Sequence, residues 1–144
     1  MNIEFMAKAL QIAKMSGNDI PVGAVLVCNG EILAEAHNQK ESSNDVTAHA
    51  EILVMREASK KLVNWRLNGC DLYVTLEPCP MCLWAILQSR IDNLYFGSFD
   101  QIYGGFSSSA QCLYKLSNSR LNYKGGILEA DCNKLLNSYF ERIR

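Results

Sequence analysis

A chain of 144 residues has the length of one ordinary domain, and its composition, 49% hydrophobic and 20% charged, is that of a globular protein with a core. These values exclude disordered and fibrous classes, and a net charge of −1 excludes a general attraction to nucleic acid. Residues 115–144 differ from the rest, because they carry six basic and three acidic side chains, although a solvated helix face has the same composition. We interpret residues 1–144 as a single domain in which any nucleic-acid contact is made by a local patch.

The N-terminal stretch lacks the features of an exported or membrane-anchored protein. Glu4, Lys8 and Lys14 interrupt its apolar positions, and the sequence contains no apolar run of about 18 residues. We therefore expect a cytoplasmic protein without a membrane segment. In that compartment, the six cysteines are expected to be reduced thiols or metal ligands rather than disulfides.

Two helices and a hairpin are predicted in the first half of the chain. The pattern indicates a helix near residues 6–13, a β-hairpin over 21–36, a polar loop over 38–46 and a helix that reaches Leu62. Gly17 can end the first helix in the left-handed conformation, and Asn29-Gly30 is a strong signal for a two-residue hairpin turn. Thr47 can cap the second helix.

The second half alternates strands with helices. The pattern predicts strands at 72–76, at 94–97 and weakly near 127–128, helices at 81–88, 112–116 and 135–143, and a glycine- and serine-rich loop over 104–109. This alternation after an initial hairpin indicates an α/β fold of three layers, with a central mixed sheet flanked by helices. In such sheets, functional sites gather where strands end and helices begin.

Two short motifs fall at predicted helix starts. The first is His49-Ala50-Glu51 and the second is Cys79-Pro80-Met81-Cys82. Taken separately, a His-x-Glu is usually an incidental helix start, and a Cys-x-x-Cys can be a redox pair, half of a structural zinc site or two core thiols. Together, one imidazole and two thiolates form a zinc site with three protein ligands and a fourth position open to water. The sequence therefore predicts one catalytic zinc ion per chain, held by His49, Cys79 and Cys82.

A fourth protein ligand would make this site structural rather than catalytic. The candidates are His37, Cys28, Cys70, Cys112 and Cys132. Each of these cysteines stands alone among apolar residues and is explained more simply as a small core residue. His37 follows the predicted hairpin, where we expect it to face solvent or line a pocket.

Glu51 is the carboxylate nearest in sequence to a predicted ligand, and we expect it to move protons as the catalytic residue. Residues two apart lie on nearly opposite sides of a regular helix, so His49 and Glu51 converge only if the pair straddles an irregular first turn. Glu77 precedes Pro78 and is therefore expected in extended conformation at a strand end, where it could orient a metal ligand rather than act as an acid.

The motifs His49-x-Glu51 and Pro78-Cys79-x-x-Cys82 resemble the signature of the zinc-dependent nucleobase deaminases. Nearly the whole chain is similar to one branch, the bacterial tRNA-specific adenosine deaminases, notably at residues 21–27, at Asn38 and at Phe96-Gly97-x-x-Asp100. The resemblance implies a cytidine-deaminase-like fold, a homodimer, and hydrolysis of the wobble adenosine in the anticodon loop of an arginine tRNA to inosine.

The same resemblance implies four substrate-binding residues. Asn38 would hydrogen-bond the extruded nucleoside, Asp100 would contact a neighbouring part of the anticodon, and Phe140 and Arg142 on the terminal helix would press on flanking nucleotides. Each has a simpler explanation from the residues alone: Asn38 as a turn residue, Asp100 as a loop cap, and the aromatic stripe of the terminal helix as core.

Two other functions are compatible with parts of the sequence. Residues 80–83 also resemble bacterial guanine deaminases, so a free purine base is the main alternative substrate. A non-catalytic, zinc-stabilised RNA-binding module is a further alternative, but it needs neither Glu51 nor an open coordination position.

Overall fold

The computed structural model describes residues 1–108 and 112–144, and within them five strands form one mixed sheet in the order β2-β1-β3-β4-β5. β1 is antiparallel to β2 and β3, whereas β3, β4 and β5 run parallel. The strands are β1 Gly23–Cys28, β2 Glu31–His37, β3 Cys70–Leu76, β4 Asn93–Ser98 and β5 Asn122–Lys124. The helices are α1 Ile3–Ala13, the 3₁₀ turn η1 Lys14–Ser16, α2 Ala50–Leu62, α3 Pro80–Ser89, α4 Cys112–Leu116 and α5 Glu129–Ile143.

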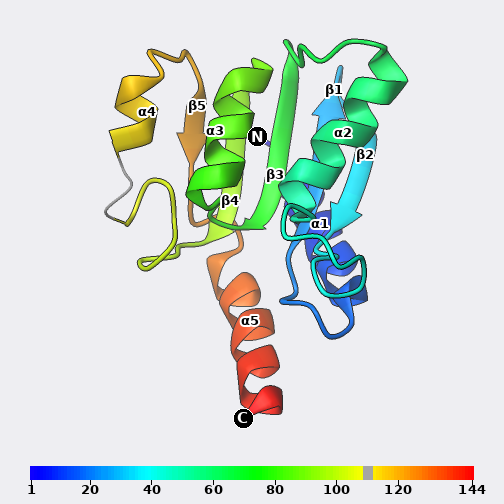
Figure 1. Ribbon diagram of the computed structural model, residues 1–144, viewed down its shortest axis with the longest axis vertical. Helices are drawn as coiled ribbons and strands as arrows, with labels where there is room; N and C mark the ends of the chain where they lie inside the picture. Colours follow the sequence, from blue (N-terminus) through cyan, green and yellow to red (C-terminus); the bar gives the residue numbers. More distant parts are fainter. Residues whose placement is uncertain (109–111) are drawn as a thin grey trace.

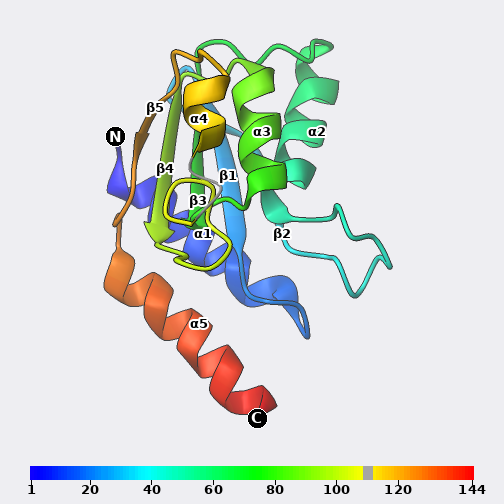
Figure 2. The same cartoon turned by 60° about the vertical axis from the view of Figure 1, so that its left-hand side comes forward.

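Helices cover both faces of the sheet, which confirms the predicted three-layer α/β fold. α2, α3 and α4 lie on one face, while α1 packs on the other and α5 begins there before it extends beyond the sheet (Figures 1 and 2). Alternate residues of the central strands supply the two cores, for example Leu72 and Val74 on the α2–α3 side and Tyr73 on the α1 side. No helix of residues 1–108 and 112–144 is long and apolar enough to cross a membrane.

The hairpin forms as predicted, because Cys28 and Glu31 are paired across the two-residue turn. Asn29 and Gly30 both have positive φ, at 54° and 78°, which is the conformation that a type I′ turn requires. Three other predictions need correction, and they concern a helix cap, a strand and the state of two cysteines.

Thr47 does not cap α2. Its side chain donates to Asp45 instead, at 2.7 Å, and the N-cap position is His49, in extended conformation with φ −78° and ψ 149°. The side-chain oxygen of Asn38 accepts the Ala50 N–H at 2.8 Å, so the helix is capped from a distant loop. Sequence spacing could not reveal a cap that comes from twelve residues upstream.

The strand expected near residues 127–128 lies earlier, at β5. Its three residues are exposed at the sheet edge, so they lack the apolar pattern that marks a strand. The Ile127 N–H still bonds to the Phe96 carbonyl at 3.1 Å, but Leu128 then turns left-handed, with φ 52°, into α5.

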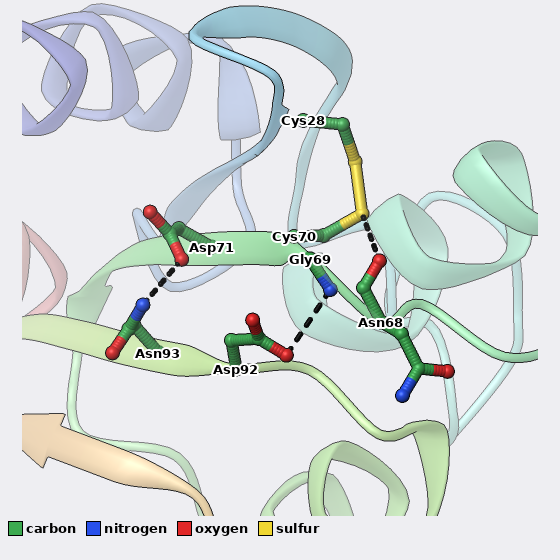
Figure 3. The surroundings of a disulfide bond; sticks show 7 residues. All are labelled: Cys28, Asn68, Gly69, Cys70, Asp71, Asp92 and Asn93. Carbon is green, nitrogen blue, oxygen red and sulfur yellow. Dashed lines mark hydrogen bonds between the residues drawn. A yellow bond between two sulfur atoms is a disulfide. The ribbon is translucent and has the colours of Figure 1, made fainter.

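Cys28 and Cys70 form a disulfide, contrary to the expectation of reduced thiols (Figure 3). The two residues stand opposite each other in the antiparallel β1–β3 pair, with their Cα atoms 4.5 Å apart. This is the close spacing that a cross-strand disulfide needs. The expectation came from the cellular compartment, which carries no information about which strands are neighbours.

Candidate metal and catalytic site

The three predicted metal ligands converge at one end of the central strands, where β3 ends and α3 begins. β3 ends at Leu76 and leads through Glu77 and Pro78 to Cys79, which is the N-cap of α3, and Cys82 lies in the first turn of that helix. His49 is the N-cap of the neighbouring helix α2. Because both helices begin at this end of the strands, the ligand atoms of these three residues lie within 4.8 Å of one another.

Hydrogen-bond distances define this group more closely. His49 Nδ1 lies 3.7 Å from Cys79 Sγ and 3.4 Å from Cys82 Sγ. Among the described residues no fourth His, Cys, Asp or Glu joins the group. Cys28 and Cys70 are bonded to each other at the far end of β3, and Cys132 packs in the α1-side core. The side chain of Cys112 lies outside the described part of the chain.

Hydrogen bonds among the two thiols and the imidazole shift the pKa values of all three groups. A hydrogen bond from Cys82 lowers the pKa of Cys79 to about 4, and the same bond, together with burial, raises the pKa of Cys82. The hydrogen bond with Cys79 raises the pKa of His49. The protein alone therefore favours one thiolate in this group, and a bound metal ion must displace the proton of Cys82. One imidazole and two sulfur donors match the preference of zinc.

Glu51 lies beside this group, as the second residue of α2. His49 has an extended backbone and precedes the helix, as the predicted irregular first turn requires, and the side chains of His49 and Glu51 line the same cavity. Glu51 is only 4% exposed, and burial raises its pKa to about 7. A carboxyl group with a pKa near neutrality can both accept and release a proton at physiological pH.

The site opens into a cavity of about 740 Å³, within the size range of small-molecule sites. His49, Glu51 and Cys79 lie in its wall, together with Asn38 and Asp100. The structure therefore places two of the four predicted substrate-binding residues, Asn38 and Asp100, in the same cavity wall as the metal group, which consists of His49, Cys79 and Cys82.

Asn38 and Asp100 also have structural roles. Asp100 caps its loop as the residues alone suggested, whereas Asn38 caps α2 rather than acting as a simple turn residue. Asn38 accepts the first N–H of α2 and donates to the Ile20 carbonyl at 3.1 Å. Asp100 accepts the backbone N–H groups of Ile102 and Tyr103 at 3.1 and 2.9 Å. A structural role and a position in the cavity wall thus coexist in both residues.

Phe140 and Arg142 do not line the cavity, and Phe140 is 41% exposed. The residue of α5 that reaches the cavity is Tyr139, whose hydroxyl donates to the Asn18 carbonyl at 2.9 Å. The Arg142 guanidinium lies over the Tyr139 ring, 5.6 Å from its centroid. The sequence pattern grouped Tyr139 with an apolar stripe, and only its polar hydroxyl could have indicated a position at a rim.

The role expected for Glu77 was wrong, and Tyr103 was not predicted as a site residue. The Glu77 side chain bonds to Asp100, Phe106 and Ser107 of a single loop, and none of these partners is a predicted metal ligand. Tyr103 lines the cavity but no motif marked it.

The chain is similar to known proteins over nearly its whole length. The cytidine and deoxycytidylate deaminase zinc-binding region matches residues 1–98, which contain both motifs. The tRNA-specific adenosine deaminase of Bacillus subtilis (strain 168) is 44% identical over 146 residues, which cover 97% of this chain and 89% of the relative. The chain belongs to the tRNA-specific adenosine deaminase family. It is thus a member of a family of zinc-dependent hydrolytic deaminases, as its sequence motifs predicted.

Solved structures support the same assignment. One from a study of A-to-I editing by tRNA:A34 deaminases at the wobble position of transfer RNA is 40% identical, with a TM-score of 0.89 over 94% of this chain and 100% of that chain. This confirms the predicted cytidine-deaminase-like fold. A guanine deaminase from Bacillus subtilis is 42% identical, with a TM-score of 0.66, but the match covers only 69% of this chain and 66% of that one.

Proposed function

We propose that this protein hydrolyses adenosine to inosine at the wobble position of a tRNA anticodon. The observation that carries the proposal is the buried Glu51 carboxyl beside the His49–Cys79–Cys82 group, at the wall of an open cavity. Two relatives that are 44% and 41% identical and cover 97% of this chain are tRNA-specific adenosine deaminases.

We propose one zinc ion per chain, held by His49 Nδ1 and the sulfur atoms of Cys79 and Cys82. The three donor atoms fit zinc in type and spacing, and three protein ligands leave one coordination position free. When bound, zinc supplies Lewis acidity that makes a water molecule acidic near neutral pH.

Glu51 carries the protons of the reaction. In this hydrolysis, oxygen from water bonds to C6 of the base, the C6–N bond breaks, and the nitrogen leaves as ammonia. The two protons of the water end on N1 of the base and on the departing nitrogen. Glu51 is the buried carboxyl that can accept each proton and release it, since its pKa lies near 7.

Asn38 is suited to orient the base. An amide side chain has two donor hydrogens and two acceptor lone pairs, and the fold uses one of each, with Ala50 and with Ile20. The remaining donor and acceptor can pair with a base in the cavity. Because both ends of the amide are already held, little side-chain entropy is lost on binding.

An anticodon loop suits this site because its bases are single-stranded and cost little to unstack. Lys40, Tyr103 and Tyr139 add a cation and two aromatic rings to the cavity wall, beyond what a free purine requires. On α5, Phe140 and Arg142 both contact the Tyr139 ring, and they are the candidate contacts to flanking nucleotides. The partial likeness to a guanine deaminase keeps a free purine as the second candidate substrate.

Three further features of the proposal rest mainly on family resemblance: a cytoplasmic location, an arginine tRNA as substrate, and a homodimer. The dimer is also supported by apolar side chains exposed around α2 and α3. Trp65 is 54% exposed, and Met81 and Trp84 are also exposed. Met81 and Trp84 lie about one turn apart on α3, and neighbouring exposed apolar residues are typical of a protein–protein interface.

Product analysis tests the proposal directly. Purified zinc-loaded protein is incubated with an anticodon stem-loop that carries adenosine at the wobble position, and separately with free guanine. We expect inosine in the stem-loop with the wild-type protein and none with Glu51→Gln. Ammonia release from guanine, without inosine in the stem-loop, would instead establish the second candidate.

A further inference from the structure

The Glu77 carboxylate holds a loop that no sequence motif connected to it. Its Oε1 accepts the Asp100 N–H at 3.0 Å and the Ser107 hydroxyl at 2.6 Å. Its Oε2 accepts the N–H groups of Phe106 and Ser107 at 2.9 and 2.8 Å. Four donors from the segment 100–107 therefore meet one side chain that is only 2% exposed. A buried carboxylate is tolerated when its oxygens are satisfied in this way.

The loop approaches this carboxylate closely because it contains glycines at the contact. A Cβ atom on Gly104 would overlap the Glu77 carboxylate, and one on Gly105 would overlap the Leu83 side chain at 2.5 Å. The Gly105 N–H also bonds to the Pro78 carbonyl at 2.8 Å. The loop is thus attached to the same short segment that delivers Cys79 to the metal group.

The attached loop forms part of the cavity wall. Asp100 and Tyr103 both line the cavity, and Asp100 closes the turn between them by accepting the Tyr103 N–H. The position of these two side chains relative to Cys79 therefore depends on Glu77, which lies two residues before that ligand.

We propose that Glu77 is a positioning residue for substrate binding. Its carboxylate fixes Asp100 and Tyr103 in the cavity wall, in a set relation to the metal-binding segment. The inference rests on the proposed function, because the residues it positions are assigned there to substrate. Glu77 also lines the cavity, but both of its side-chain oxygens are engaged by this loop, so it acts on the substrate through the residues it holds.

Glu77→Gln is a selective perturbation of this contact. Replacing Oε2 by an NH₂ group would set it against two backbone N–H donors, whereas at Oε1 it meets only one, since the Ser107 hydroxyl can turn to accept. The amide is therefore expected to keep its oxygen toward Phe106 and Ser107. The bond lost is the one to Asp100.

The test measures kcat and KM on the anticodon stem-loop, together with zinc content. We expect Glu77→Gln to raise KM about tenfold or more, the effect of losing a hydrogen bond to a charged acceptor, while kcat changes less and zinc is retained. The matched control is Asp92→Asn, which makes the same carboxylate-to-amide change where Asp92 accepts the Gly69 N–H at the far end of β3 (Figure 3). That control should leave KM unchanged.

A double-mutant cycle with Asp100→Ala separates positioning from general stability. If Glu77 acts through Asp100, adding Glu77→Gln to Asp100→Ala should raise KM by less than about threefold. Full additivity of the two changes, or an effect no larger than that of Asp92→Asn, would overturn the inference. Loss of zinc from Glu77→Gln would do so as well, because the residue would then act on the metal group.

Gly104→Ala provides a second route if Glu77→Gln does not fold. The added methyl group displaces the loop and leaves the carboxylate intact, so KM should again rise while zinc is retained. An unchanged KM would count against the inference. If the wild-type protein deaminates guanine and not the stem-loop, the proposed function fails, and the same variants measured on guanine still decide the role of Glu77.

Discussion

Reduction of the Cys28–Cys70 disulfide is expected to destabilise the chain while leaving its fold in place. The two residues already face each other in the β1–β3 ladder, so the folded state keeps its pairing when the bond opens. The unfolded chain, in contrast, gains the freedom of a loop with a sequence separation of 42. The loop-entropy relation gives about 4 kcal/mol for a loop of this length. Since domains of this kind are stable by about 5–15 kcal/mol, the change is a large one.

Urea unfolding with and without a phosphine reductant measures this difference, and thermal unfolding should show a shift on the order of 10 °C. The variant Cys28→Ala/Cys70→Ala is the control, because its unfolding midpoint should not respond to the reductant. Thiol titration in denaturant should find two more thiols after reduction. An unchanged midpoint in the wild-type protein, with no gain in thiols, would refute the reasoning. In a reducing cytoplasm, which is the proposed location, this pair would be open and the chain would have the lower of the two stabilities.

The remaining predictions concern the site. Glu51→Gln should lower kcat by about 10²- to 10⁴-fold with zinc retained, and loss of zinc by this variant would make Glu51 a ligand. Cys82→Ala should lose zinc on metal analysis, and an unchanged content would disprove the proposed ligand set. Asn38→Ala should lower the free energy of unfolding by about 1 kcal/mol, measured in urea, because α2 loses its cap; equal stability would mean that the cap contributes nothing. Arg142→Gln with Arg144→Gln should make stem-loop binding less dependent on salt concentration. An unchanged dependence would show that these two arginines of the C-terminal region do not contact the RNA phosphates.

The fold was predictable where sequence signals are local. Asn29-Gly30 marked the hairpin because only a few residue types accept positive φ at both turn positions. β5 was misplaced because Asn122–Lys124 lies exposed at an edge, and its place in the sheet depends on hydrogen bonds to β4. The Cys28–Cys70 pair was missed for the same reason, since strand neighbours are a tertiary property.

The convergence of His49, Cys79 and Cys82 was predictable because zinc chemistry restricts the residue types. One histidine and two cysteines in this arrangement are a typical set of zinc ligands, and the adjacent Glu51 completes the pattern expected of a catalytic site. The residue types in the rest of the cavity wall are not restricted by one chemistry in this way. Three of the four donors to Glu77 are backbone N–H groups, which every residue except proline possesses, so the sequence of 100–107 gives little sign of its partners.

The disulfide and the Glu77 contacts lie at opposite ends of β3, so both depend on the register of this strand. A slip of one residue along this strand would turn Glu77 away from its loop, because side chains alternate between faces. The register is fixed at one end by Cys70, opposite Cys28, and near the other by Thr75, whose hydroxyl accepts the Gly23 N–H at 3.1 Å. The parallel ladder with β4 continues to Leu76, and the Glu77 N–H bonds to the Ser98 carbonyl at 2.8 Å. The strand is therefore held by β1 as far as Thr75 and by β4 through Glu77. Held in this way close to Cys79, it gives the rigid support that a precise site requires.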